Sequence, residues 1–215
     1  CGRHDAVNLG SAREVVISTA VKPGNPELEA APAKGIPIIR RAEILAELMR
    51  LYQSISVTGT HCKTPTTSLI AHVLKDTGLE PTVITGGIIN DWGSNARLGA
   101  GPWMVVEADE SDGTFIKIPT QIGVVTNIDP EHLDYFGSVE NMHREYEMFF
   151  RNIPFYGMAV TCTDHPVAPE MIARLQFGPD GPRLFNYRPR AGCELPPHAL
   201  RPDCPTTNFD PCLFH

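Results

Sequence analysis

The sequence contains 215 residues, of which 42% are hydrophobic and 20% are charged, and its 18 basic against 25 acidic side chains give a formal charge of −7. This composition is typical of a globular protein that buries a core in one or two domains, and the acidic excess argues against nucleic-acid binding, which depends on basic side chains that neutralise phosphates. No apolar stretch approaches the ~20 residues that cross a bilayer and no signal sequence opens the chain, so we expect no membrane insertion and a cytosolic location.

The first fifty residues predict a strand, a helix and a second strand in succession. The β-branched run at 15–19 and the apolar run at 36–39 are typical of strands, and residues 27–34 predict a helix between them although Pro32 weakens it. Apolar residues recur at helical spacing over 41–51, which predicts a second helix. This order forms a βαβ unit and indicates parallel strands.

Strands and helices continue to alternate up to about residue 175. Apolar runs predict strands at 55–58, 82–85, 103–106, 122–126 and 158–163, and helices are expected at 63–77 and 139–150. The second of these helices carries its apolar side chains on one side, namely Met142, Tyr146, Phe149 and Phe150. We therefore expect an α/β fold, a parallel sheet flanked by helices, over residues 52–175.

Residues 176–215 differ from the rest of the chain in composition. They contain eight prolines and three cysteines but no Val, Ile, Met or Lys, so we expect an irregular tail. The abrupt change fits a shifted reading frame, and a natural tail is the alternative. The six cysteines of the whole chain include no Cys-x-x-Cys pair, so a disulfide scaffold is not indicated.

A phosphate-binding loop is indicated where the predicted strand 55–58 passes into the helix 63–77. The loop reads Gly59-Thr60-His61-Cys62-Lys63-Thr64. Phosphate loops direct backbone N–H groups at phosphate oxygens, a lysine at the β and γ phosphates and a hydroxyl at Mg²⁺. Lys63 and Thr64 are of the right types for the last two roles, and an ordinary helix-capping loop is the alternative interpretation.

Two residues depart from the usual pattern of such a loop. The position before the lysine is normally glycine, because the backbone there can need a positive φ, but here it is Cys62. A Cβ at that position costs roughly 1–3 kcal/mol of backbone strain. Pro65 lacks an N–H that could donate to a phosphate, although proline is tolerated in a first helical turn.

Two further predicted strands end in polar clusters. The strand 103–106 runs into the acidic segment 107–112, and the strand 122–126 runs into a segment that holds His132 between carboxylates. In an open α/β sheet, ligands bind beyond the C-terminal ends of the strands, where a carboxylate such as Glu107 can hold a nucleotide's Mg²⁺. We expect Lys63, Glu107 and His132 to converge on one crevice; a solvated acidic turn and a structural histidine are the alternatives.

Together these motifs resemble those of the ATP-dependent Mur ligases. The matching segments are 59–64, Thr85 to Asn90, Asn95 to Gly99, Glu107 to Gly113, Thr126 to Asp134 and Asn152 to Gly157. His61 and the segments after Glu107 and Thr126 favour the branch of the family that joins L-alanine to UDP-N-acetylmuramate in peptidoglycan synthesis.

The resemblance covers about residues 12–175 and implies three regions. Residues 1–50 would be the C-terminal part of a Rossmann-like UDP-binding domain, 51–175 part of the central ATP-binding domain, and 176–215 a tail of unknown origin. The first residue is Cys1 instead of Met, which also predicts a fragment.

The resemblance implies an enzyme that uses ATP and Mg²⁺ to form an acyl phosphate on the muramate carboxylate, which the amine of L-alanine then attacks. Lys63 would contact the β and γ phosphates, and Thr64 and Glu107 the first Mg²⁺, with His132 on a second metal. The ATP-binding residues would be Gly59, Thr60, His61, Cys62, Lys63, Thr64 and Pro65. The substrate-binding residues would be Asn90, Asn95 and Arg97 on the muramate side and Ser18 and Thr19 near the UDP.

Because the resemblance covers only part of such an enzyme, we expect this chain to be inactive as a ligase by itself. One alternative is a nucleotide-binding module that does not ligate. A second is a non-functional relic or an interaction fragment without a ligand. A titration with ATP would distinguish these alternatives.

Overall fold

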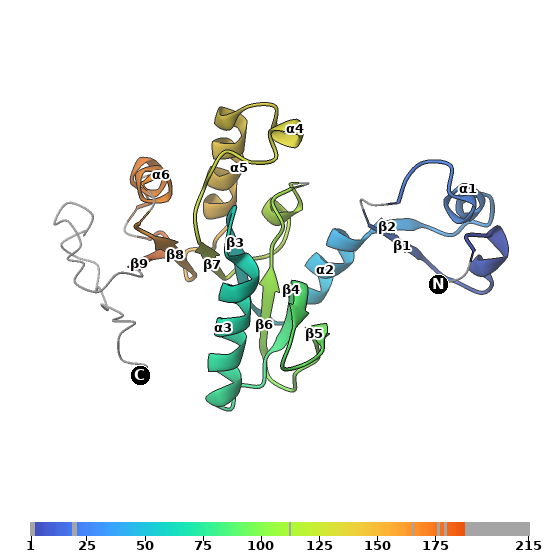
Figure 1. The fold of residues 1–215 in the computed structure, drawn as a ribbon, viewed down its shortest axis with the longest axis horizontal. Coiled ribbons are helices and arrows are strands. Elements are labelled where there is room, and N and C mark those ends of the chain that lie inside the picture. Colours follow the sequence, from blue (N-terminus) through green and yellow to red (C-terminus); the bar gives the residue numbers. More distant parts are fainter. Residues whose placement is uncertain are drawn as a thin grey trace. The chain divides into compact units, whose positions relative to one another are not determined.

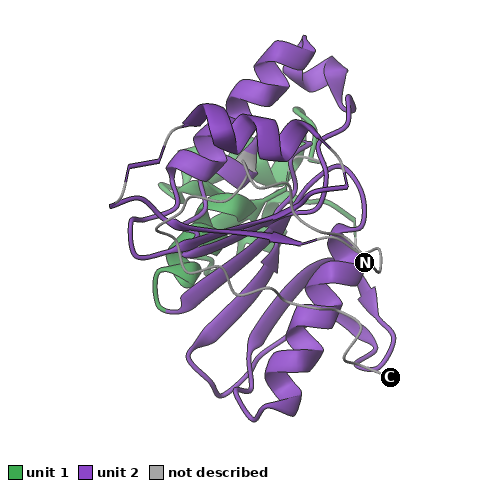
Figure 2. Ribbon diagram, turned by 90° about the vertical axis from the view of Figure 1, so that its left-hand side faces the viewer, with its two compact units in different colours: residues 1–51 green, residues 52–215 purple. Residues whose placement is uncertain are grey.

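The structure is a computed structural model that describes residues 3–18, 21–111, 113–164, 166–175, 177–178 and 180–187. The chain divides into two compact units, unit 1 from Cys1 to Leu51 and unit 2 from Tyr52 to His215 (Figure 2). None of the helices in the described residues has both the length and the hydropathy that a bilayer-spanning helix requires.

Unit 1 contains the predicted βαβ unit. Its elements are the short helix η1 (Ala6–Leu9), β1 (Val15–Ile17), α1 (Pro26–Ala33), β2 (Ile38–Arg40) and α2 (Arg41–Met49). Strands β1 and β2 pair in parallel, with Val15 opposite Ile38. Helix α1 forms because Asn25 caps it, its Oδ1 accepting from the Glu27 N–H at 2.9 Å, while Pro32 lies in the last turn.

Unit 2 is a mixed but mostly parallel seven-stranded sheet with helices (Figure 1). Its strands are β3 (Gln53–Thr58), β4 (Thr82–Ile89), β5 (Ser94–Arg97), β6 (Trp103–Glu107), β7 (Ile122–Val125), β8 (Met158–Cys162) and β9 (Arg183–Tyr187). Its helices are α3 (Lys63–Asp76), η2 (Thr114–Ile116), α4 (Leu133–Phe136), α5 (Val139–Arg151) and α6 (Val167–Leu175). The strand order is β5-β4-β6-β3-β7-β8-β9, which confirms the predicted α/β class.

The two faces of the sheet are covered by different helices. On one face Val57 of β3 and Val124 of β7 belong to an apolar cluster against which Ile70 and Leu74 of α3 pack. On the other face Gly123 of β7 lies beneath Phe149 of α5. The buried side of α5 consists of the four residues predicted from its periodicity, Met142, Tyr146, Phe149 and Phe150. Central strands are therefore buried on both faces, as parallel strands require.

Strand β3 lies where the strand order reverses: β4, β5 and β6 lie on one side of it and β7, β8 and β9 on the other. It pairs with β6 on one side, where Val57 lies opposite Glu107, and with β7 on the other, where Thr58 lies opposite Val125. Since these strands are parallel, the segments that follow them leave the sheet at the same edge. Such a switch point is where open α/β sheets bind ligands.

The structure differs from the sequence analysis at two strands, β5, which was not predicted, and β9. Strand β5 is antiparallel to β4, because the connection between Ile89 and Ser94 is too short for the crossover that a parallel pair needs. The tail was expected to be irregular from residue 176, yet β9 pairs in parallel with β8, with Phe185 opposite Val160. Absence of Val and Ile misled the prediction, because Leu184, Phe185 and Tyr187 supply the apolar and aromatic side chains of a strand.

Helices α4 and α6 were also not predicted. Helix α6 buries Ala168, Met171, Ile172 and Leu175, which follow a helical spacing that the sequence analysis overlooked. The rest of the predicted tail, residues 188–215, lies outside the described residues.

The contact between β7 and α5 allows a test of the packing. A Cβ added to Gly123 would lie 2.7 Å from Ile153 Cδ1 and 3.0 Å from the Phe149 ring. We expect Gly123→Ala to lower the free energy of unfolding by about 1–3 kcal/mol, because the helix must shift to make room. Urea unfolding would measure this, with the exposed Gly178→Ala as control, since a Cβ there meets nothing within 4 Å. Equal stability of both variants would contradict the described packing.

Candidate functional site

The segment between β3 and α3 is a tight loop with two residues at positive φ. Gly59 has a φ of 129°, and a Cβ at this position would collide with Thr126 Oγ1 and lie 2.9 Å from the Asn127 carbonyl oxygen. Only glycine therefore fits between the loop and the segment that follows β7.

Cys62 adopts the left-handed conformation, with a φ of 62° and a ψ of 18°, immediately before α3 begins. The sequence analysis anticipated a positive φ at this position. For a residue with a Cβ this conformation costs about 1–2 kcal/mol. Pro65 occupies the first turn of α3, where the backbone N–H has no partner within the helix, so its ring does not interrupt the helix.

The segment 126–129 after β7 holds the loop in place through several hydrogen bonds. The Asn127 side chain accepts from the His61 N–H at 2.9 Å and donates to the His61 carbonyl oxygen at 3.2 Å. Thr126 Oγ1 donates to the same carbonyl at 2.6 Å. Thr60 Oγ1 donates to the Asp129 carbonyl at 3.1 Å and accepts from the Asp129 N–H at 2.9 Å. The loop is thus bound to a segment more than sixty residues away in the chain.

Lys63 points back over the loop. Its Nζ donates to the carbonyl oxygens of Gly59 at 2.8 Å and Thr60 at 3.3 Å, and to Glu110 Oε1 at 2.8 Å. The ion pair is enclosed, since the Lys63 side chain is 16% exposed and that of Glu110 only 3%. The ammonium group therefore lies where the loop, the edge of β6 and the buried carboxylate meet.

Glu110 is the buried carboxylate of the acidic segment after β6. Burial raises the pKa of Glu110, although the neighbouring Lys63 ammonium acts to lower it. His132 Nε2 lies 3.8 Å from Glu110 Oε1, and Glu110 Oε2 is buried without a hydrogen-bond partner among the described residues. Tyr146 of α5 is near enough for the Glu110 charge to act on it. Burial of the Tyr146 side chain, and to a lesser extent the Glu110 charge, raises the pKa of the phenol.

Glu107 and Thr64 form a second polar pair beside Lys63. Thr64 Oγ1 donates to Glu107 Oε2 at 2.8 Å, and the Gly86 N–H donates to the same oxygen at 2.9 Å. A hydroxyl and a carboxylate oxygen side by side are ligands of the type that Mg²⁺ prefers. Among the described residues, no three His, Cys, Asp or Glu side chains are grouped as a metal cage. The pair suits an ion that keeps most of its water ligands.

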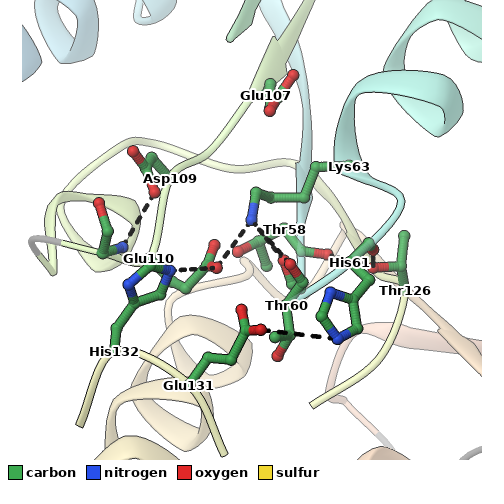
Figure 3. A network of polar contacts seen from close by, with 12 residues as sticks. Thr58, Thr60, His61, Lys63, Glu107, Asp109, Glu110, Thr126, Glu131 and His132 are labelled. Carbon is green, nitrogen blue, oxygen red and sulfur yellow. Dashed lines mark hydrogen bonds and ion pairs between the residues drawn. The ribbon is translucent and has the colours of Figure 1, made fainter. Parts of the chain in front are cut away.

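Figure 3 shows five of the residues that the sequence analysis assigned to ATP and metal, namely Thr60, His61, Lys63, Glu107 and His132. Lys63 and His132 both contact Glu110, and Thr64 contacts Glu107. Lys63 and His132 therefore meet at Glu110, whereas Glu107 bonds Thr64 and Gly86, and a crevice shared by Lys63, Glu107 and His132 stays a prediction. His132, at a φ of 51°, faces Glu110 instead of Glu107.

The proposed substrate residues lie elsewhere. Arg97 pairs with Glu80 at 2.8 Å and stacks over the Trp92 ring at 5.2 Å, and its backbone lies opposite Val83 near the start of β4. Arg97 is therefore directed away from the edge that carries Lys63. Asn90 and Asn95 are exposed near the β4–β5 turn.

Of the two residues assigned to the UDP side, Ser18 follows β1 in unit 1 and Thr19 lies outside the described residues.

Sequence analysis assigned no role to Glu110 or Asn127, although both lie in quoted motifs. Glu110 differs from its acidic neighbour Asp109 in being buried, as Ala108 is, and this difference is visible only in the structure. No local signal pointed to Asn127, because its partner His61 is distant in the chain.

The chain matches known proteins over most of its length. A model of the Mur ligase middle domain matches residues 57–180, and one of the Mur ligase family catalytic domain matches residues 3–53. A UDP-N-acetylmuramate--L-alanine ligase of Granulibacter bethesdensis is 63% identical over 172 residues, which are 80% of this chain and 36% of that protein. One of Rhizobium meliloti is 52% identical over 207 residues, 96% of this chain and 43% of that protein.

Solved structures agree with these matches. The UDP-N-acetylmuramate-alanine ligase of Thermotoga maritima superposes with a TM-score of 0.71 at 30% identity, covering 86% of this chain and 41% of that one. The Rhizobium match extends beyond residue 175, so the expected end of the resemblance there is wrong. The chain spans less than half the length of these relatives. Because the middle-domain match alone covers more than half of the 215 residues, the chain belongs to the Mur ligase family.

Proposed function

We propose that this chain provides the ATP-binding part of a ligase that joins L-alanine to UDP-N-acetylmuramate through an acyl phosphate. The names of its relatives support the substrates. The observation that carries the nucleotide role is the arrangement of Lys63, Thr64 and Glu107 at the edge of the sheet, where a lysine, a hydroxyl and a carboxylate meet at the start of a helix.

Lys63 and the loop 59–62 would bind the phosphates. All three ammonium protons are used, by two loop carbonyls and Glu110. A phosphate oxygen must therefore replace at least one of these acceptors. Exchange of a neutral carbonyl for a charged phosphate strengthens the hydrogen bond, while the bond to Glu110 keeps the ammonium in the loop.

Thr64 and Glu107 would hold a Mg²⁺ ion. Their oxygens are already adjacent, and the Gly86 N–H orients the carboxylate. The bound ion would offset the charge that develops on the transferred phosphoryl group. His132 is the candidate for a second metal, which it would share with Glu110.

Asn90 and Asn95 are proposed to face the muramate, and Ser18 and Thr19 the UDP. Their exposure leaves the side chains of Asn90 and Asn95 accessible to a ligand. The contacts of Arg97 with Glu80 and Trp92 instead favour a structural role for Arg97, which holds the β4–β5 hairpin.

Removing the ammonium of Lys63 should weaken ATP binding. We expect Lys63→Ala to raise the Kd for Mg-ATP at least about tenfold, since a hydrogen bond to a charged group contributes about 1.5–3 kcal/mol. Titration calorimetry would measure it, with Lys75→Ala at the far end of α3 as matched control. An unchanged Kd for Lys63→Ala would contradict the nucleotide role.

Restoring glycine at position 62 should strengthen ATP binding. Because Cys62 is already left-handed without a nucleotide, glycine helps only those free molecules whose loop has relaxed, so we expect Cys62→Gly to lower the Kd by at most about tenfold, which corresponds to about 1–2 kcal/mol. Cys62→Ala is the control, because it removes the thiol but keeps the Cβ. Improvement by Ala as large as that by Gly would show that the thiol, not the backbone, limits binding.

Ligation itself is expected to need more than these 215 residues. Two substrates must be held in near-attack geometry, and the relatives that carry this activity in their names are more than twice as long as the matched part. Phosphate release from ATP that depends on both UDP-N-acetylmuramate and L-alanine should therefore be absent. Binding of ATP without release would support a nucleotide-binding module in this chain, and turnover that needs both substrates would refute our expectation.

A further inference from the structure

Asn127 is one of the residues through which the segment after β7 holds the phosphate loop, together with Thr126 and Asp129. Its side-chain amide bonds both the N–H and the carbonyl oxygen of His61, at 2.9 and 3.2 Å, and its own carbonyl accepts from the Thr60 N–H at 3.2 Å. A side-chain amide has a carbonyl oxygen that accepts and an NH2 group that donates, so it can bond the N–H and the carbonyl oxygen of one residue at the same time. Asn127 therefore orients the peptide groups on both sides of His61, and Thr126 Oγ1 shares the His61 carbonyl with it.

The held residue directly precedes the strained one. The His61 carbonyl is part of the peptide bond to Cys62. Cys62 adopts a φ of 62° although it has a Cβ. Nothing on the Cys62 side chain stabilises this conformation, because it makes no capping hydrogen bond and is exposed. The left-handed turn into α3 must be imposed from outside, and the bonds to the His61 carbonyl lie next to it.

The chain that continues from this segment also positions His132 beside Glu110. The His61 ring lies 3.6 Å from Asp129 Oδ2 and 4.0 Å from Glu131 Oε1, and His132 Nε2 follows 3.8 Å from Glu110. Glu110 in turn binds Lys63. The segment 126–132 thus contacts the loop at His61 and the Lys63–Glu110 ion pair through His132 (Figure 3).

We propose that Asn127 is a positioning residue that holds the phosphate loop in its left-handed conformation at Cys62, and that this chain depends on it because position 62 is not glycine. The inference rests on the proposed nucleotide role of the loop. With glycine at 62 the turn is available without strain, so the loop reaches the binding conformation without Asn127. With cysteine, loss of the amide lets the turn relax to an unstrained conformation that directs the N–H groups elsewhere.

A double-mutant cycle tests this dependence. Variants of the full 215-residue chain would carry Asn127→Ala, Cys62→Gly or both, and their Kd for Mg-ATP would be measured. We expect Asn127→Ala to raise the Kd about tenfold, but only about threefold or less in the Cys62→Gly background. Asn152→Ala is the matched control, since its amide also bonds a backbone carbonyl, that of Ile116, away from the loop. It should change the Kd less than twofold.

Urea unfolding of the same variants gives a readout that needs no nucleotide. The change in midpoint caused by Cys62→Gly should be more favourable with Asn127 present than in the Asn127→Ala background, where the strain is already released. Equal losses of affinity in both backgrounds, or an additive unfolding cycle, would overturn the inference. Failure of the unchanged chain to bind ATP would overturn the proposed function instead, and the unfolding cycle would still decide the role of Asn127.

Discussion

The pairing of β3 with β6 on one side and β7 on the other is the constraint from which the site follows. Three segments that are far apart in the chain leave parallel strands at one edge, and each brings one kind of group. The loop after β3 supplies Lys63, the segment after β6 supplies Glu107 and Glu110, and the segment after β7 supplies Asn127 and His132. Any change in strand order would separate them.

The electrostatics of the site depend on the buried carboxylate of Glu110. A buried charge is costly unless it is paired, and Lys63 pairs it at 2.8 Å. The pair keeps the ammonium inside the loop, close to where phosphates are proposed to bind. The unpartnered Oε2 atom leaves part of the hydrogen-bonding capacity of this carboxylate unused within the described residues. Such an arrangement is typical of functional sites, where stability is given up for local chemistry.

Backbone strain also lowers the stability of the site. Cys62 and His132 both adopt positive φ without being glycine. Both are connected to the segment 126–129. That segment is hydrogen-bonded to His61, the residue before Cys62, and His132 follows it three residues later in the chain. Rigid attachment of a loop to a neighbouring strand end is a general way to maintain a conformation that the residue itself does not favour.

The sequence by itself determined the class of fold, the α5 core face and the position of the loop that leads from β3 to Lys63 and Thr64 at the start of α3. These follow from local rules: apolar periodicity of 2 or 3.6 residues, and a Gly-to-Lys-Thr pattern between a strand and a helix. It could not determine that β5 runs antiparallel, that β9 joins the sheet or that Arg97 faces Glu80. Those outcomes depend on which strands pair, and pairing partners are distant in the chain. Only the tertiary structure could place Asn127 against His61 and Glu110 against Lys63, because a polar side chain's partner is decided by packing and not by its neighbours in sequence.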